Sequence, residues 1–181
     1  MRRRAVFLDR DGVVNESIVR DGKPFPPTSV RETIPVARAR ESLERLKARK
    51  FLLIVVTNQP DVRRGTIRLE EIEEIHGFLG RQLPLDDFFA CYHDDGDNCD
   101  CRKPNPGLLL QAARKYEVEL QTSYLVGDRW RDIDAGAAAG CRTVLIDRGY
   151  NERSPAFVPN AVVSSLEEAV DWILRQEVEL Y

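Results

Sequence analysis

Short apolar runs alternate along this chain with longer stretches in which apolar residues recur at helical spacing. This alternation is typical of repeated strand–helix–strand units, and it predicts an α/β fold in which helices cover both faces of a parallel sheet. The expected strands are Ala5–Leu8, Phe51–Thr57, Phe88–Tyr92, Tyr124–Val126 and Thr143–Asp147, with a further edge strand at Ala161–Val163. The expected helices are about Val36–Arg49, Leu69–Leu83, Pro106–Tyr116, Ile133–Ala139 and Leu166–Arg175.

Two proline-containing stretches interrupt this alternation. Residues 15–35 hold Pro24, Pro26, Pro27 and Pro35, and residues 94–106 combine four aspartates with two prolines. Because proline fixes φ and removes a backbone donor, neither stretch is expected to form ordinary helix or central strand. We expect both to be loops near the functional site. No low-complexity linker or internal repeat divides the chain, so residues 1–181 are expected to form a single domain with a Rossmann-like sheet.

Charge and hydropathy restrict the partners of this chain. With 27 basic and 30 acidic residues the net charge is −3, which gives no electrostatic reason to expect nucleic-acid binding. The longest apolar run, Phe51–Val56, is far shorter than the roughly 18 residues that span a bilayer. Arg2, Arg3 and Arg4 precede too short an apolar run, Ala5–Leu8, for a signal peptide. We therefore expect a cytoplasmic protein with a small-molecule or protein partner. A monomer is compatible with the sequence, which leaves the oligomeric state open.

Acidic and other polar residues follow the expected strands. The carboxyl ends of parallel strands meet at one edge of a sheet, where ligands of open α/β folds bind. Four carboxylates there against one ammonium group require a cation, and Mg²⁺, which prefers carboxylate oxygens together with a substrate phosphate, suits them. This pattern predicts phosphoryl chemistry. The residues concerned are Asp9, Asp11, Thr57, Asn58, Lys103, Asp128 and Asp132, with Gly12 allowing a sharp turn after the first strand.

Three of the four cysteines share one short segment with a histidine. Cys91, His93, Cys99 and Cys101 supply three thiols and one imidazole within eleven residues, a complete tetrahedral ligand set for a structural Zn²⁺. The spacing is tighter than the usual C-x₂-C pattern, so free thiols beside a surface histidine are the alternative. The cluster favours a reducing compartment over a disulfide framework. Cys141 stands apart and is expected in the core.

The polar residues after the expected strands form four motifs that resemble those of the haloacid dehalogenase superfamily of phosphotransferases. The resemblance spans positions 5–147. The motifs read here Asp9-Arg10-Asp11-Gly12-Val13, Thr57-Asn58, Lys103 and Gly127-Asp128-Arg129-Trp130-Arg131-Asp132. The resemblance implies that Asp9 is a nucleophile that forms an aspartyl-phosphate and that Asp11 is the acid and base. Asp11 must then be protonated often enough near neutral pH, which a crowd of like charges is expected to promote.

The same resemblance implies the remaining roles. Mg²⁺ would be held by Asp9, Asp128 and the backbone carbonyl of Asp11, with Asp132 supporting the metal or Lys103. Thr57 and Lys103 would hold the phosphoryl oxygens. A carboxylate is a poor nucleophile toward an anionic phosphate until such cations neutralise the repulsion.

The cysteine segment narrows the resemblance to the histidinol-phosphatase and heptose-bisphosphate-phosphatase branch of the superfamily. That branch carries a Cys-x-His…Cys-x-Cys zinc loop directly before Arg-Lys-Pro, here Arg102-Lys103-Pro104, and lacks a large cap domain. The loop is then expected to keep Lys103 in register. Without a cap domain, residues in loops would have to recognise the substrate. The candidates are the segment Asp21–Pro27 and the side chains of Asn58, Arg63, Arg64, Arg102, Arg129 and Arg131.

The sequence leaves the substrate open. Lys103-Pro104-Asn105-Pro106-Gly107 is similar to the heptose-bisphosphate enzymes, whereas the five-residue gap between His93 and Cys99 is short, as in the histidinol-phosphate enzymes. We expect a phosphatase of a small phosphorylated metabolite, first a heptose bisphosphate and alternatively histidinol phosphate. Two hypotheses of other classes are a non-hydrolytic phosphoacceptor signalling module and a non-catalytic zinc-stabilised binding module. A phosphoacceptor module would carry its aspartate after the third strand, where this chain has the cysteine segment.

Overall fold

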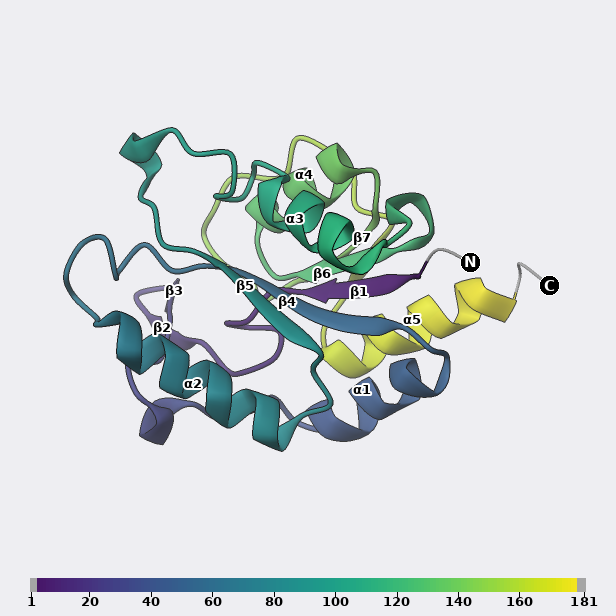
Figure 1. Cartoon of the computed structure of the whole chain (residues 1–181), viewed down its shortest axis with the longest axis horizontal. Helices are drawn as coiled ribbons and strands as arrows, with labels where there is room; N and C mark the ends of the chain where they lie inside the picture. Colours follow the sequence, from purple (N-terminus) through teal and green to yellow (C-terminus); the bar gives the residue numbers. More distant parts are fainter. Residues whose placement is uncertain (1–2, 179–181) are drawn as a thin grey trace.

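A six-stranded parallel sheet forms the centre of the molecule in the computed structural model, which describes residues 3–178 (Figure 1). The strand order is β5-β4-β1-β6-β7-β8, and every neighbouring pair is parallel. Since β1 lies in the middle, the residues that follow it enter the centre of the carboxyl edge. The strands are β1 (Ala5–Leu8), β4 (Leu52–Asn58), β5 (Asp87–Cys91), β6 (Tyr124–Gly127), β7 (Arg142–Ile146) and β8 (Ala161–Val163).

Helices cover both faces of the sheet, as the alternation of patterns predicts. Figure 1 shows α1, α2 and α5 on one face and α3 and α4 on the other. Alternate residues of β1 enter the two cores: Val6 packs with α1, α2 and α5, and Phe7 packs with α3 and α4. The α/β fold class is confirmed. The helices are α1 (Ala39–Ala48), α2 (Leu69–Gln82), α3 (Gly107–Tyr116), α4 (Trp130–Ala139) and α5 (Leu166–Val178).

An antiparallel hairpin occupies part of the stretch that was expected to be loop. Strands β2 (Ile18–Arg20) and β3 (Lys23–Phe25) pair outside the main sheet, with Pro24 opposite Val19. Asp21 and Gly22 between them both have positive φ, 50° and 71°, as a two-residue hairpin turn requires. The loop expectation is therefore wrong for these residues, because the Asp-Gly turn allows an isolated hairpin that tolerates proline.

Three short 3₁₀ helices complete the elements: η1 (Val30–Glu32), η2 (Asp95–Asp97) and η3 (Leu120–Thr122). The element η2 lies in the second of the expected loops, between His93 and Cys99. It has no buried residue, so it is held in place by polar contacts alone.

Helix boundaries differ from expectation by three residues at three places. Helix α1 begins at Ala39 because Arg38 before it has a left-handed backbone with φ of 56°. Val36 donates its backbone N–H to Val14 O at 3.1 Å, which ties this segment to the loop after β1. Helix α4 begins at Trp130, three residues early, since the Asp132 carboxylate accepts from the backbone N–H of Arg129 and caps the first turn. Helix α5 extends beyond Arg175, where the buried Glu177 accepts a hydrogen bond from the Tyr124 hydroxyl.

The described residues contain no large cap domain. The hairpin, η1 and α1 fill the interval from Asp11 to Thr57, and α2, β5 and η2 fill the interval from Thr57 to Lys103. The assignment of the whole chain to one domain stays a prediction. Between residues 3 and 178, none of the helices has the length and apolar character needed to cross a membrane.

Candidate active site

The site residues meet at the carboxyl edge of the sheet, around a cavity of about 320 Å³. Asp9 directly follows β1, Thr57 is the residue before the last in β4, and Asp128 directly follows β6. Gly12, with φ of +84°, turns the chain back over the strand ends, and a Cβ there would collide with the Asp128 carboxylate. The cavity is lined by Asp9, Asp11, Thr57, Lys103, Asp128 and Asp132, among others.

Lys103 is buried at the base of this cavity. Its Nζ donates to Asp9 Oδ1 at 2.8 Å, to Asp132 Oδ1 at 2.6 Å and to the Val56 carbonyl at 2.7 Å. Burial alone would lower the pKa of Lys103, but the two carboxylates raise it above its ordinary value, so the side chain is an ammonium group. Burial and the charge of Asp132 raise the pKa of Asp9 to about 6, although Lys103 opposes that shift.

Asp128 has no such partner. It is buried and forms no ion pair, and its carboxylate oxygens have no hydrogen bond of good geometry, although the Tyr150 hydroxyl and Arg129 lie near enough to oppose the rise in its pKa. Burial, followed by the charges of Asp9 and Asp132, raises the pKa of Asp128 well above its ordinary value. One ligand oxygen from each of these three carboxylates lies within 4.8 Å of the others. A buried carboxylate without an ion-pair partner, facing two more oxygen ligands, fits a hard divalent cation such as Mg²⁺.

Asp11 lies in a different environment. Arg10 binds its carboxylate in bidentate fashion, with Nε–Oδ1 and Nη2–Oδ2 distances of 3.0 Å. Asn15 Nδ2 donates to Oδ1 at 3.0 Å and Gln59 Nε2 to Oδ2 at 2.9 Å. Burial raises the pKa of Asp11, but Arg10 and these hydrogen bonds together bring it below its ordinary value. The expectation that crowded carboxylates keep Asp11 protonated is therefore wrong for this arrangement, since four donors favour the ionised form.

His76 supports Arg10 from helix α2. Arg10 is fully buried, and its Nη1 lies 3.3 Å from His76 Nε2. Because a guanidinium only donates, Nε2 is the acceptor and the imidazole is neutral with its proton on Nδ1. Burial, with the charge of Arg10, lowers the pKa of His76 to about 4, and its ring stacks on Phe88 at 4.7 Å. Sequence reasoning missed Arg10, Asn15, Gln59 and His76; only the position of Arg10 between two acids was a signal.

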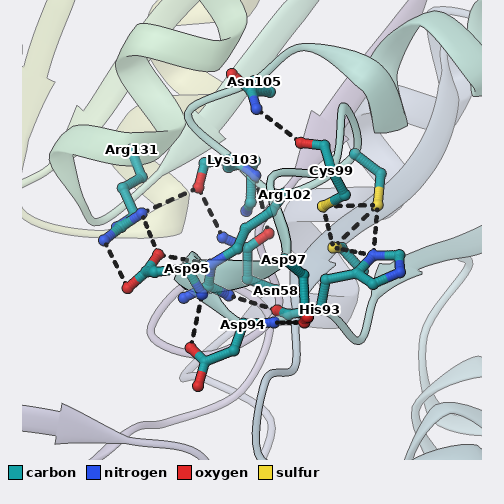
Figure 2. A network of polar contacts seen from close by, with 12 residues as sticks. Asn58, His93, Asp94, Asp95, Asp97, Cys99, Arg102, Lys103, Asn105 and Arg131 are labelled. Atoms are coloured by element: carbon teal, nitrogen blue, oxygen red, sulfur yellow. Dashed lines mark hydrogen bonds and ion pairs between the residues drawn. The ribbon is translucent and has the colours of Figure 1, made fainter. Parts of the chain in front are cut away.

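The four expected zinc ligands converge. The Cys101 Sγ lies 3.0 Å from Cys91 Sγ and 3.5 Å from Cys99 Sγ, and His93 Nδ1 lies 3.3 Å from Cys101 Sγ. All four donor atoms fall within 4.8 Å of one another (Figure 2). Three sulfurs and one imidazole nitrogen at this spacing fit a tetrahedral Zn²⁺ and leave no position for substrate.

Polar contacts connect this cluster to Lys103. Asn58 Oδ1 accepts from the Lys103 backbone N–H at 3.0 Å, and Asn58 Nδ2 donates to the Lys103 carbonyl at 3.0 Å. Asn105 Nδ2 donates to the Cys99 carbonyl at 2.8 Å. Figure 2 shows this network between the cysteines and Lys103. Asn58, expected to contact substrate, thus uses its amide to hold the backbone of Lys103.

The arginines expected to bind substrate divide into two groups. Four of them line the cavity, namely Arg64, Arg102, Arg129 and Arg131. Arg63 does not line it; its guanidinium lies 3.5 Å from Asp97 on the surface. Each lining arginine has an acidic partner: Asp94 for Arg64, Asp95 for both Arg102 and Arg131, and Glu152 for Arg129. None of these acidic partners was predicted from the sequence.

Comparison with known proteins places this geometry in a family. A family model described as HAD-hydrolase-like matches residues 100–169. The D-glycero-beta-D-manno-heptose-1,7-bisphosphate 7-phosphatase of Helicobacter pylori J99 is 31% identical over 94% of this chain and 97% of its own length. The enzyme of the same name from Pseudomonas aeruginosa is 35% identical over 85% of this chain and 86% of its own length.

A solved structure agrees with these relatives. The crystal structure of D,D-heptose 1,7-bisphosphate phosphatase from B. bronchiseptica, complexed with magnesium and phosphate, is similar with a TM-score of 0.79 and 30% identity, covering 96% of this chain and 99% of that one. Fold, site and relatives together define a phosphatase of the HAD-like hydrolases. Within that class, the chain belongs to the heptose-bisphosphate phosphatase family.

Proposed function

We propose that this enzyme hydrolyses a phosphomonoester of a heptose bisphosphate through an aspartyl-phosphate on Asp9. The observation that carries the proposal is the position of Asp9, whose Oδ1 accepts a hydrogen bond from the buried Lys103 ammonium beside the Asp128 carboxylate, which forms no ion pair. A carboxylate held between an ammonium and a cation site can approach an anionic phosphate. This supports the nucleophile role for Asp9.

In the first step an Asp9 carboxylate oxygen attacks phosphorus and the bond from phosphorus to the sugar oxygen breaks. Asp11, which is ionised in the structure, takes up a proton from solvent before this step and gives it to the departing oxygen. In the second step water attacks phosphorus, its proton goes to Asp11, and the Asp9 carboxylate and inorganic phosphate are released. The ionised Asp11 of the structure suits the second step. Lys103 and Thr57 hold the phosphoryl oxygens throughout.

Asp9, Asp128 and the backbone carbonyl of Asp11 would hold Mg²⁺, with Asp132 fixing Lys103. When bound, Mg²⁺ neutralises phosphoryl charge and orients the phosphoryl group. The B. bronchiseptica structure, which contains magnesium and phosphate, supports this cofactor. We assign Zn²⁺ to Cys91, His93, Cys99 and Cys101 as a structural ion, and its cysteine ligands, none of which forms a disulfide, favour the reducing cytoplasm.

The names of the relatives support D-glycero-D-manno-heptose 1,7-bisphosphate as the substrate, with the 7-phosphate as the reacting group. The cavity arginines Arg64, Arg102, Arg129 and Arg131 supply positive charge for its second phosphate. Histidinol phosphate has one phosphate, so it would leave these groups unused.

A panel of phosphorylated metabolites, assayed with Mg²⁺ and ranked by kcat/KM, tests the proposal. We expect the heptose 1,7-bisphosphate to rank first, ahead of histidinol phosphate and of hexose monophosphates. A histidinol phosphate value above that of the bisphosphate would overturn the substrate assignment. Failure to turn over any phosphomonoester, including p-nitrophenyl phosphate, would overturn the reaction itself.

A further inference from the structure

Asp95 occupies a position between two cavity arginines that come from different elements. Its Oδ1 accepts from Arg102 Nε at 2.8 Å and from Arg131 Nη1 at 3.1 Å, and Figure 2 shows the carboxylate between the two guanidinium groups. Arg102 precedes Lys103 at the end of the zinc loop, and Arg131 lies in the first turn of α4. The three side chains line the same cavity as Asp9.

The charges in this group do not balance. Two guanidinium groups face one carboxylate, and the neighbouring Asp94 is held by Arg64 through two hydrogen bonds of 2.7 Å. A phosphate dianion would match two guanidinium groups better than one carboxylate does, because each guanidinium can bind phosphate oxygens in bidentate fashion.

The two arginines have additional contacts that do not depend on Asp95. Arg102 Nη1 donates to the His93 carbonyl at 3.2 Å, and the Arg131 guanidinium lies 4.6 Å from the ring centroid of Trp130. Their side chains are 11% and 25% exposed, whereas Asp95 is 58% exposed. The arginines are therefore fixed against the protein, and the carboxylate covers them from the solvent side.

The element that carries Asp95 can move at low cost. Element η2 has no buried residue, and its internal contacts are the hydrogen bonds of the Asp94 and Asp97 carboxylates with backbone N–H groups at 2.8 Å and the backbone bond from Asp97 to the Asp94 carbonyl at 3.1 Å. Segments held by exposed polar contacts alone open with small free energies. A zinc ion bound by ligands on both sides of η2, His93 before it and Cys99 after it, would restrict the movement to this turn.

We propose that Asp95 is an internal competitor for the second phosphate of the substrate, which displaces the carboxylate from Arg102 and Arg131 on binding. This inference rests on the proposed function, since it requires a substrate with two phosphates. A monophosphate with a neutral distal end leaves Asp95 in place. Asp95 thereby sets how strongly the enzyme prefers a bisphosphate and how readily the product, which keeps its second phosphate, leaves.

Steady-state kinetics of Asp95→Asn test the inference. With D-glycero-D-manno-heptose 1,7-bisphosphate we expect KM to fall at least about threefold, as loss of a partly exposed competing ion pair predicts, with the product inhibition constant falling in parallel. With the 7-monophosphate KM stays unchanged. Asp97→Asn is the matched control, because it removes the same charge from the same turn but its partner Arg63 does not line the cavity.

An unchanged or higher KM of Asp95→Asn for the bisphosphate overturns the inference, since Asp95 would then only orient the arginines. An equal change for mono- and bisphosphate also overturns it. In Arg131→Gln the gain from Asp95→Asn should shrink, because one of the two contested groups is gone; an undiminished gain contradicts the mechanism.

A second arm separates this inference from the proposed substrate. If neither heptose phosphate is turned over, the substrate assignment fails. The competition between Asp95 and a second phosphate is then tested by calorimetric binding of fructose 1,6-bisphosphate and fructose 6-phosphate to the Asp9→Asn protein with Mg²⁺. Tighter binding of the bisphosphate alone on adding Asp95→Asn supports the competitor. No change in its affinity overturns it.

Discussion

Asp11 differs from the other carboxylates of the site in the groups that surround it. Asp9, Asp128 and Asp132 face one another and Lys103, whereas Asp11 faces Arg10 and two amides. A buried guanidinium in bidentate contact fixes both the orientation and the ionised form of a carboxylate. The two acids of the Asp-x-Asp motif are therefore in opposite electrostatic environments, although one residue separates them, which suits a nucleophile and a proton-transfer group.

The role of Asp11 predicts a loss that depends on the leaving group. Asp11→Asn should reduce kcat for a sugar phosphate by roughly 10²–10⁴-fold, because an alkoxide needs a proton to depart. The loss should be much smaller for p-nitrophenyl phosphate, whose phenolate leaves without one. Equal losses on the two substrates would argue against the acid role and leave water activation alone.

Asp9 and Asp128 predict a pH-dependent effect of Mg²⁺. Because burial and like charges raise their pKa values, that of Asp9 to about 6, both groups hold protons more tightly when folded. Their ionisation therefore costs the folded protein stability as pH rises through about 6, and a bound cation offsets that cost only where they are ionised.

Thermal unfolding should thus show a larger increase in Tm with Mg²⁺ at about pH 7.5 than at about pH 5. Asp128→Asn should remove most of that increase, because it takes away the carboxylate that forms no ion pair within the protein. An increase that is the same at both pH values would contradict a magnesium site at these carboxylates.

At the scale of elements, the cysteine loop connects a soft ligand cluster to Lys103. The loop leaves β5 at Cys91, returns at Cys101 and reaches Lys103 two residues later, where Asn58 of β4 holds its backbone. The ammonium is thus positioned by a loop that would be fixed by metal at one side and by the sheet at the other. Thiolates select zinc and carboxylates select magnesium, so the two sites should not exchange metals.

Removal of zinc is expected to act on both stability and turnover. Cys99→Ser/Cys101→Ser should lose the one zinc ion per chain in elemental analysis, lower Tm and reduce kcat by roughly 10²-fold as Lys103 shifts. Added Mg²⁺ should not restore activity. Cys141→Ser is the control, since that buried thiol lies outside the cluster and its loss should leave the zinc content unchanged.

Two outcomes would separate the steps of this argument. Unchanged zinc in the double variant, or none in the parent protein, would remove the site. Zinc that is present but whose loss leaves turnover intact would show that the loop supports the fold without positioning Lys103.

At the scale of the whole molecule, the sequence predicted the sheet, its helices and the meeting of the acids, because apolar periodicity and the strand-end rule act through short segments. The contact between Arg10 and His76 could not be predicted from the sequence, since the two residues lie 66 positions apart and meet only through the packing of α2. The same holds for Asp95 with Arg131. Asp21-Gly22, in contrast, was a readable hairpin signal that the neighbouring prolines obscured.

The central claim is that Asp9 carries the phosphoryl group, and trapping that intermediate tests it most directly. Enzyme mixed with saturating substrate and Mg²⁺ is quenched in acid within one turnover, digested and analysed by mass spectrometry, with a borohydride-reduced sample in parallel. The account predicts one phosphoryl group on the peptide that contains Asp9, reduction of that residue alone to homoserine, and neither signal in Asp9→Asn, whose turnover falls by roughly three orders of magnitude or more. Product release with no labelled peptide, or with the label on a peptide that lacks Asp9, would contradict it.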